Sequence, residues 1–499
     1  MSQLVATGCG IIIPRVMIGA FGSAVYGLTT SIAQFLSYVS LLEGGVGRVA
    51  RAELYGPLVK KDDYEISRVY YAIRHFFGIV AAIFVAYTLI LSISYFDIAK
   101  TQSTNREVVF LLVWIISIST LAKYVGGLAN LTLLNADQKQ YIGNSIVMVT
   151  TAANAILLVI LTKLKCNIMT VKLVSSIVYL VQPVCYALYV RKYYQLRPVG
   201  KNRSRLEQKW TGIGQHIAYF LHTNTDVVLL TMFADIRLVA IYNVYRLIVT
   251  SIRKIAASAT GGMEAVFGEL VAREEKDLLQ STFWKYKLLL STISSVLFGT
   301  TAVLILPFVK IYTSGITDAE YIQPVFAMVI LFAEAIDCVM HPCSSLPVAA
   351  NKLKQTRWGS YGEAFINICL SLVLIRWNPL LGIAIGTLCA AIFKSIYYMI
   401  YSAKYILRIK VQELLGNYLL VVLILGISTA VGLALMNVNC ITNYFQWCWW
   451  GVVTVTSVGV ITLLLNKICY PKIFALLLGE AKAKKAENNL YEKIKNPHN

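Results

Sequence analysis

Charged residues interrupt the apolar runs of this sequence, where water cannot solvate them. A charge at the centre of a membrane helix costs about 2.5–3.5 kcal/mol, so residues of this kind are candidates for function. The basic members of the set are Arg15, Arg48, Lys123, Arg246, Arg253 and Lys394. Cationic side chains at such positions could bind phosphate groups, and the planar guanidinium of arginine donates paired hydrogen bonds to them.

The acidic members of the same set are Glu43, Asp226, Glu334, Asp337 and Glu363. Glu334 and Asp337 are three residues apart and therefore share one face of a helix. Two roles are open for these carboxylates: neutralising the basic residues, or binding a proton or Na⁺ that drives transport. One charge moved down a 100 mV membrane potential yields about 2.3 kcal/mol, so a few ions could drive a cycle. We favour Asp226 and Asp337 for function.

Each of these charges also has a structural interpretation. Long basic side chains near helix ends can reach the lipid head groups and bind nothing else. We favour that interpretation for Arg48 and Arg253, and a functional one for Arg15, Arg246 and Lys394. The acidic residues could equally form buried ion pairs that only stabilise the fold.

The composition predicts that membrane-spanning helices position these residues. The 499 residues are 57% hydrophobic and 14% charged, whereas a soluble domain has about 45–50% and 25%. A membrane helix needs roughly 20 mostly apolar residues. Fourteen spans are predicted, at about 3–20, 24–46, 74–96, 107–133, 140–162, 168–190, 212–234, 240–262, 286–310, 321–348, 357–376, 380–403, 413–436 and 446–466. The short loops that remain leave no room for a soluble catalytic domain.

The net charge of +20 reflects membrane topology. With the N-terminus placed inside, 33 of the 45 lysines and arginines fall in connections and a tail on the inner side. Cytoplasmic loops carry such an excess of positive charge. Both termini are therefore predicted to be cytoplasmic, and no nucleic-acid partner is expected.

A basic segment around 191–210 divides the predicted spans into two sets of six. Glu43-Gly44-Gly45 and Thr260-Gly261-Gly262 lie at similar places in the two halves, which indicates a weak internal repeat. Parallel repeats of this kind suit transport by alternating access. The predicted domains are an N-lobe at 1–192, a basic cytoplasmic linker at 193–211, a C-lobe at 212–406, two further helices at 407–466, and a basic tail at 467–499.

Several motifs together resemble a known family. They are Pro14-Arg15, the FG-x-x-x-YGL turn, Gln34, Leu41-Leu42-Glu43-Gly44-Gly45, and the IYNVYRLI segment before Thr260-Gly261-Gly262. The chain resembles the polysaccharide flippases of the multidrug/oligosaccharidyl-lipid/polysaccharide (MOP) exporter superfamily. The resemblance implies an all-α protein with two six-helix lobes in a V-shaped arrangement plus two C-terminal helices. Helices one, two and eight would line its cleft.

The same resemblance implies a function and a location. The protein would move undecaprenyl-diphosphate-linked oligosaccharide across the bacterial inner membrane for O-antigen, capsule or exopolysaccharide assembly. Its partners would be membrane lipids and, in the same pathway, a polysaccharide polymerase and glycosyltransferases. No cofactor is expected beyond a coupling H⁺ or Na⁺.

Two alternatives remain open. A drug antiporter of the same superfamily would usually have twelve spans and fewer cavity cations. A membrane glycosyltransferase or polymerase would carry its catalytic motif on a sizeable loop, whereas the external loops at 97–106, 163–167, 311–320 and 437–445 are short. We therefore predict that the chain is not an enzyme. The ten cysteines form no CxxC pair and the five histidines do not cluster with them, so no metal site is expected.

Overall fold

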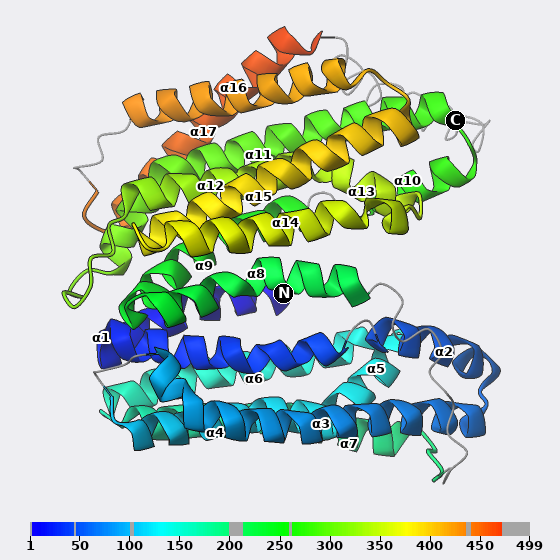
Figure 1. The fold of residues 1–499 in the computed structure, drawn as a ribbon, viewed down its shortest axis with the longest axis vertical. Helices are drawn as coiled ribbons and strands as arrows, with labels where there is room; N and C mark the ends of the chain where they lie inside the picture. The colour runs from blue at the N-terminus through cyan, green and yellow to red at the C-terminus, as the bar shows by residue number, and fades with distance from the viewer. Residues whose placement is uncertain are drawn as a thin grey trace, which may run out of the picture. The chain divides into compact units, whose positions relative to one another are not determined.

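The protein is an all-α, multi-pass membrane protein (Figure 1). The structure, a computed structural model, describes residues 2–43, 46–99, 104–198, 213–258, 262–435 and 441–471. Within these ranges, nine helical segments are long and apolar enough to cross a membrane. They become ten if α12 (Pro324–Val339) and α13 (His341–Ala349), which are bent by 42°, count as one span. The predicted fold class is confirmed.

Each of the fourteen predicted spans falls on a helix. Two of them fall on α1 (Ser2–Ser37), where the backbone leaves helical geometry at Gly22 (φ 82°, ψ 165°) and the chain changes direction (Figure 1). Three others fall on α8 (Ile213–Phe233), α9 (Ile236–Ser258) and α14 (Leu353–Leu374), which are not among the nine segments. These helices carry many of the charges that interrupt the apolar pattern.

The remaining helices can be given with their bounds. They are α2 (Val46–Lys60), α3 (Asp63–Ala99), α4 (Arg106–Ala122), α5 (Leu128–Ala136), α6 (Gln140–Lys163), α7 (Ile168–Tyr193), α10 (Met263–Ala272), α11 (Lys276–Tyr312), α15 (Pro379–Tyr401), α16 (Val411–Leu435) and α17 (Tyr444–Cys469). The predicted linker at 193–211 is described only as far as residue 198, and most of the predicted tail lies outside the described residues.

The order of the helices repeats along the chain. The short helices α2 and α10, which the span pattern does not predict, each precede a helix of 37 residues, α3 and α11. The next span is interrupted in both halves: a π-helical turn at Lys123–Gly127 separates α4 from α5, and the bend separates α12 from α13. This order agrees with the predicted internal repeat.

The chain forms two compact units, which we describe one at a time. The first comprises Met1–Leu247, Thr313–Tyr321 and Ile368–Ile383, and the second comprises the rest. In the first unit, α4 packs against α3 and α7, and α6 packs against α1 and α7. The boundaries of the predicted lobes remain predictions.

A close approach in the first unit depends on glycine. A Cβ atom at Gly27 of α1 would lie 2.1 Å from the carbonyl oxygen of Ile236, at the start of α9. Any side chain here would collide with backbone, so glycine is what lets the two helices meet.

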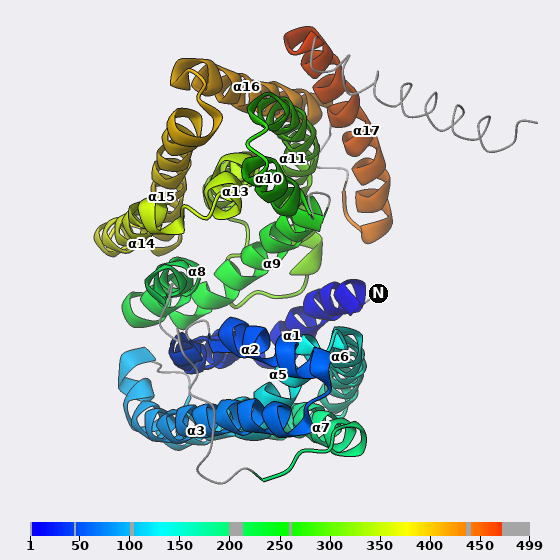
Figure 2. The same cartoon turned by 90° about the vertical axis from the view of Figure 1, so that its right-hand side faces the viewer.

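In the second unit, α11 contacts α12, α16 and α17 (Figure 2). Near its N-terminal end, the side chain of Lys287 is buried, with an exposure of 3%. Its ammonium nitrogen lies 4.6 Å from the ring centroid of Tyr418, 5.2 Å from that of Trp284 and 5.4 Å from that of Tyr470. Desolvated cation–π contacts are worth about 2 kcal/mol each, so this cage ties α16 and the end of α17 to α11.

Candidate functional site

Four polar residues on α8 and α9 form the Asp226 cluster of the first unit: Thr223, Asp226, Tyr242 and Arg246. Thr223 and Asp226 are three apart on α8, while Tyr242 and Arg246 are four apart on α9, so each pair shares a helix face. The side chain of Asp226 is 2% exposed and that of Arg246 is 25% exposed. The cluster therefore combines a buried carboxylate with a partly accessible guanidinium.

The hydroxyl group of Tyr242 connects the two charges. It donates to Oδ2 of Asp226 at 2.6 Å and accepts from Nη1 of Arg246 at 2.7 Å. The direct distance from Nη1 to Oδ2 is 3.8 Å, too long for a hydrogen bond. Nη2 of Arg246 donates to the carbonyl oxygen of Thr223 at 2.7 Å. These contacts hold Arg246 against α8.

Polar side chains from α1 surround this region. Nε2 of Gln34 donates to Oδ1 of Asn224 at 2.6 Å, and Nδ2 of Asn243 donates to Oγ1 of Thr30 at 3.0 Å. Amides and hydroxyls at membrane depth need such partners, because an unsatisfied polar group in hydrocarbon is costly. The second half of α1 therefore meets α8 and α9 through polar contacts.

Five charged residues form the Asp337 network of the second unit: Arg253, Glu334, Asp337, Glu363 and Lys394. Arg253 lies 3.0 Å from Glu334 and 3.8 Å from Asp337. The ammonium nitrogen of Lys394 lies 3.0 Å from Asp337 and 3.1 Å from Glu363. Among the described residues, three carboxylates of this network face two cations. The network connects α9, α12, α14 and α15.

The other predicted site residues lie elsewhere. Nη2 of Arg15 donates to the carbonyl oxygen of Ser314 at 2.7 Å, and Glu43 accepts from the hydroxyl of Tyr124 at 2.7 Å. Lys123 is exposed on the π-helical turn, and the side chain of Arg48 lies outside the described residues. The structure thus joins seven of the eleven predicted residues into the cluster and the network; the functional roles of all eleven remain predictions.

Sequence reasoning missed Tyr242, the residue that links Asp226 to Arg246. Its spacing of four from Arg246, within the IYNVYRLI segment, is the signal that could have found it. It also missed Ser23 and Asp318, whose contact depends on residues far apart along the chain.

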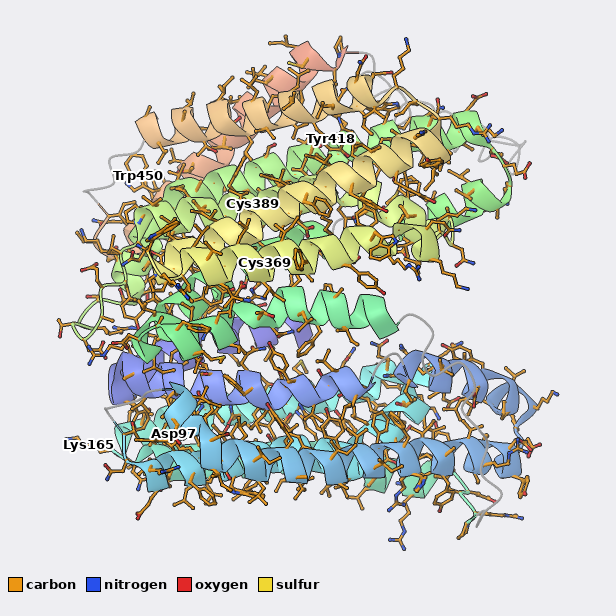
Figure 3. The ribbon with its side chains drawn as sticks, in the orientation of Figure 1. Asp97, Lys165, Cys369, Cys389, Tyr418 and Trp450 are labelled. Atoms are coloured by element: carbon orange, nitrogen blue, oxygen red, sulfur yellow. The ribbon has the colours of Figure 1, made fainter. Side chains whose placement is uncertain are left out.

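An apolar pocket of about 400 Å³ lies in the second unit between α11, α12 and α16. Its lining includes Phe298, Leu331, Val422 and Leu433. The described part of the chain contains no group of three histidine, cysteine, aspartate or glutamate residues that could hold a metal ion. The nine cysteines of the described residues are free, and Figure 3 labels two of them, Cys369 on α14 and Cys389 on α15.

Comparison with solved structures places this fold among transporters. The lipid II flippase MurJ in an inward closed conformation matches with a TM-score of 0.71 at 12% identity, over 95% of this chain and 98% of that chain. An inward-facing MATE family transporter of the MOP superfamily matches with a TM-score of 0.52 at 14% identity, over 81% of this chain and 95% of that one.

A third structure, the MATE multidrug transporter DinF-BH, gives a TM-score of 0.52 at 16% identity over 82% of this chain and 94% of its own. Neither a protein-family model nor a curated protein sequence matches the chain. At these identities the likeness shows the fold alone: that of MOP-superfamily transporters. The narrower resemblance to polysaccharide flippases remains a prediction.

Proposed function

We propose that this protein is a flippase that moves undecaprenyl-diphosphate-linked oligosaccharide from the inner to the outer leaflet of the bacterial cytoplasmic membrane. It works by alternating access and supplies O-antigen, capsule or exopolysaccharide assembly. The observation that carries the proposal is Arg246 on α9, a predicted span. Its guanidinium group is held by Thr223 and Tyr242, yet the side chain is one-quarter exposed.

The chemistry of the substrate explains why such a group is needed. A diphosphate carries negative charge that hydrocarbon cannot solvate, so its passage requires cationic or polar partners. Arginine suits it because the planar fork donates two hydrogen bonds to neighbouring oxygens. A diphosphate that competes with Asp226 for Arg246 favours a proton on Asp226. Substrate binding and proton uptake are thereby linked in one cluster.

The Asp337 network is the proposed second site of ion coupling. Its three carboxylates lie around the same two basic residues, and carboxylates gathered in this way favour uptake of one cation. We propose a proton, because the carboxylates already face the cationic groups of Arg253 and Lys394 and a proton needs no further ligands. Stimulation of transport by Na⁺ at constant pH would point instead to Na⁺ coupling.

A small-molecule or drug antiporter is the second candidate, favoured by the match to the two MATE transporters. Those matches cover 81% and 82% of this chain, whereas the match to the lipid II flippase covers 95%. The larger coverage supports a lipid-linked substrate. An enzyme is the third class, and the three similar structures described above, which are named as a flippase or as transporters, favour transport over catalysis.

The experiment is deletion of the gene in its host followed by analysis of the lipid-linked intermediates. A flippase defect leaves complete undecaprenyl-linked repeat units on the cytoplasmic face, whereas absence of one sugar linkage would indicate an enzyme. Complementation with Arg246→Ala and Arg246→Lys then tests the site. We expect loss of surface polysaccharide with alanine and partial recovery with lysine. Wild-type polysaccharide with the alanine variant, at normal protein level, would refute the role of Arg246.

A further inference from the structure

A polar pocket of about 390 Å³ lies in the second unit, and its lining shares no residue with the Asp337 network. It lies between the N-terminal ends of α11 and α16, two helices that pack side by side (Figures 1 and 2). We call it the α11–α16 pocket. Its lining forms one face of each helix: Asp277, Gln280, Ser281, Trp284 and Lys285 on α11, and Glu413 and Asn417 on α16.

The sequence predicts the level of the α11–α16 pocket in the membrane. Charged residues end at Lys287 on α11 and at Glu413 on α16, and residues 288–309 and 414–435 carry none. Apolar stretches of this length fill the hydrocarbon core of a bilayer. Both helices begin after connections that are predicted to be cytoplasmic, and Trp284 is of a type enriched at membrane–water interfaces. The pocket is therefore expected among the lipid head groups of the inner leaflet.

The amide side chains of the lining donate to carbonyl oxygens of the protein itself. Nε2 of Gln280 donates to the carbonyl oxygen of Leu407 at 2.6 Å, and Nδ2 of Asn417 donates to that of Glu413 at 2.8 Å. No donor to either amide oxygen is seen among the described residues. The two amides therefore bring hydrogen-bond acceptors to the pocket.

Two carboxylates add to these acceptors. Asp277 and Glu413 are exposed, and in the part of the chain that the structure describes neither carboxylate forms an ion pair or accepts a hydrogen bond. A ligand that satisfies the pocket must carry positive charge and donate several hydrogen bonds. A primary ammonium group does both, because it has three N–H donors and forms charge-assisted hydrogen bonds with carboxylates. A quaternary ammonium group has the same charge but no N–H donor.

We propose that the α11–α16 pocket binds the head group of an ethanolamine phospholipid from the inner leaflet. The ammonium group lies among Asp277, Glu413 and the amide oxygens, and the phosphate lies toward Lys285, a cation in the same lining. The level of the pocket favours a lipid over a soluble amine. The bound lipid joins α11 to α16 beside the hydrogen bond from the Tyr470 hydroxyl to the carbonyl oxygen of Asn417, 2.8 Å long. The inference does not depend on what the protein transports.

Lipid binding to the full-length protein tests the proposal. Purified protein stripped of lipid is titrated with phosphatidylethanolamine or phosphatidylcholine of the same acyl chains, and native mass spectrometry counts the bound lipid. The two lipids differ only in the methyl groups on the ammonium nitrogen. We expect phosphatidylethanolamine to bind at least about tenfold more tightly, because only its ammonium group can donate to the acceptors of the pocket. Equal affinities would overturn the proposal.

Two double variants place the lipid in the pocket. Asp277→Asn with Glu413→Gln removes both carboxylates and should abolish the preference for phosphatidylethanolamine; since both side chains are exposed, the fold should be kept. The matched control is Glu269→Gln with Glu275→Gln, which removes two carboxylates that pair with Arg273 and do not line the pocket. The control should keep the tenfold preference. A preference that survives the loss of Asp277 and Glu413 would show that the lipid binds elsewhere.

A soluble analogue separates a lipid from a free amine as the occupant. Glycerophosphoethanolamine has the same head group without acyl chains, so it should displace phosphatidylethanolamine only at concentrations at least about tenfold higher. If it binds to the wild-type protein as tightly as the lipid does, the pocket is a site for soluble amines and the lipid assignment fails. None of these measurements includes a transport step, so failure of the flippase proposal would leave their outcome unchanged.

Discussion

Tyr242 places a neutral hydroxyl between a guanidinium and a buried carboxylate, accepting from one and donating to the other. A direct ion pair would bind the two charges to each other more tightly. The bridged arrangement keeps Arg246 oriented while its side chain stays partly exposed. The uncharged residue Tyr242 therefore controls whether Arg246 can leave Asp226 and bind a substrate.

Removing that hydroxyl should be costly. Tyr242→Phe leaves both charged partners without their shared hydrogen bond, so the free energy of unfolding should fall by about 1.5–3 kcal/mol. Thermal unfolding in detergent measures the change. Tyr186→Phe is the control, since Tyr186 is also buried and no hydrogen bond of its hydroxyl is seen among the described residues. Equal unfolding temperatures for the two variants would contradict the bridging role.

The Asp337 network makes a prediction about pH. Glu363→Gln removes one of the three carboxylates that could take up the coupling proton, so transport should lose its dependence on external pH while the protein level stays normal. Glu269→Gln is the control, because Glu269 pairs with Arg273 on the surface, where both side chains are about 60% exposed. A pH profile that is unchanged by Glu363→Gln would exclude this network from proton coupling.

At the scale of elements, the approach of α1 to α9 depends on the absence of one side chain. Gly27→Ala forces a methyl group toward the carbonyl oxygen of Ile236 and should lower the unfolding temperature by several degrees. Gly78→Ala on α3 meets nothing within 4 Å and should be neutral or slightly stabilising. If both alanine variants unfold at the wild-type temperature, the close approach of α1 to α9 does not depend on glycine at position 27.

The aromatic rings around Lys287 should stabilise the packing of α16 against α11. Tyr418→Leu removes the nearest ring and leaves the ammonium group against aliphatic carbon, so stability should fall by about 2 kcal/mol or more. Tyr418→Phe keeps the ring and should lose much less. Chemical or thermal unfolding compares the two, and a phenylalanine variant as unstable as the leucine variant would show that the ring is not what holds Lys287.

The helices could be predicted because a membrane span requires a long apolar stretch, which is visible in the sequence. All fourteen predicted ranges fall on helices. The break at Gly22 also separates two predicted spans as expected. The helices α2 and α10 could not be predicted, since they are too short to span a membrane and follow glycine pairs. Hydropathy does not identify helices of that kind.

The sequence identified charged residues of the candidate site but did not predict which of them contact one another. Charges in apolar runs identified Asp226 and Arg246, and the spacing of Glu334 and Asp337 placed them on one face. The assignment of Glu363 and Lys394 to the same network, and the contact of Arg15 with Ser314, required the packing of segments distant in sequence. Periodicity within one helix carries no information on such contacts.

The whole molecule combines the fold of MOP-superfamily transporters with a polar cluster in the first unit and a charge network in the second. The fold is common to flippases and drug transporters, so it does not choose between them. A flippase and a drug transporter are distinguished by whether the protein moves a lipid-linked diphosphate across a bilayer. That activity can be measured only with the intact protein in a membrane.

The most direct test uses purified protein in vesicles that contain a fluorescent undecaprenyl-diphosphate-linked oligosaccharide. A membrane-impermeant reductant bleaches the outer leaflet, and the rate at which the inner-leaflet label becomes accessible measures flipping. We expect the protein to accelerate this rate, a proton gradient to increase it, and Arg246→Ala to reduce it at least about tenfold. Vesicles that export a drug but flip the lipid no faster than protein-free vesicles would refute the flippase proposal.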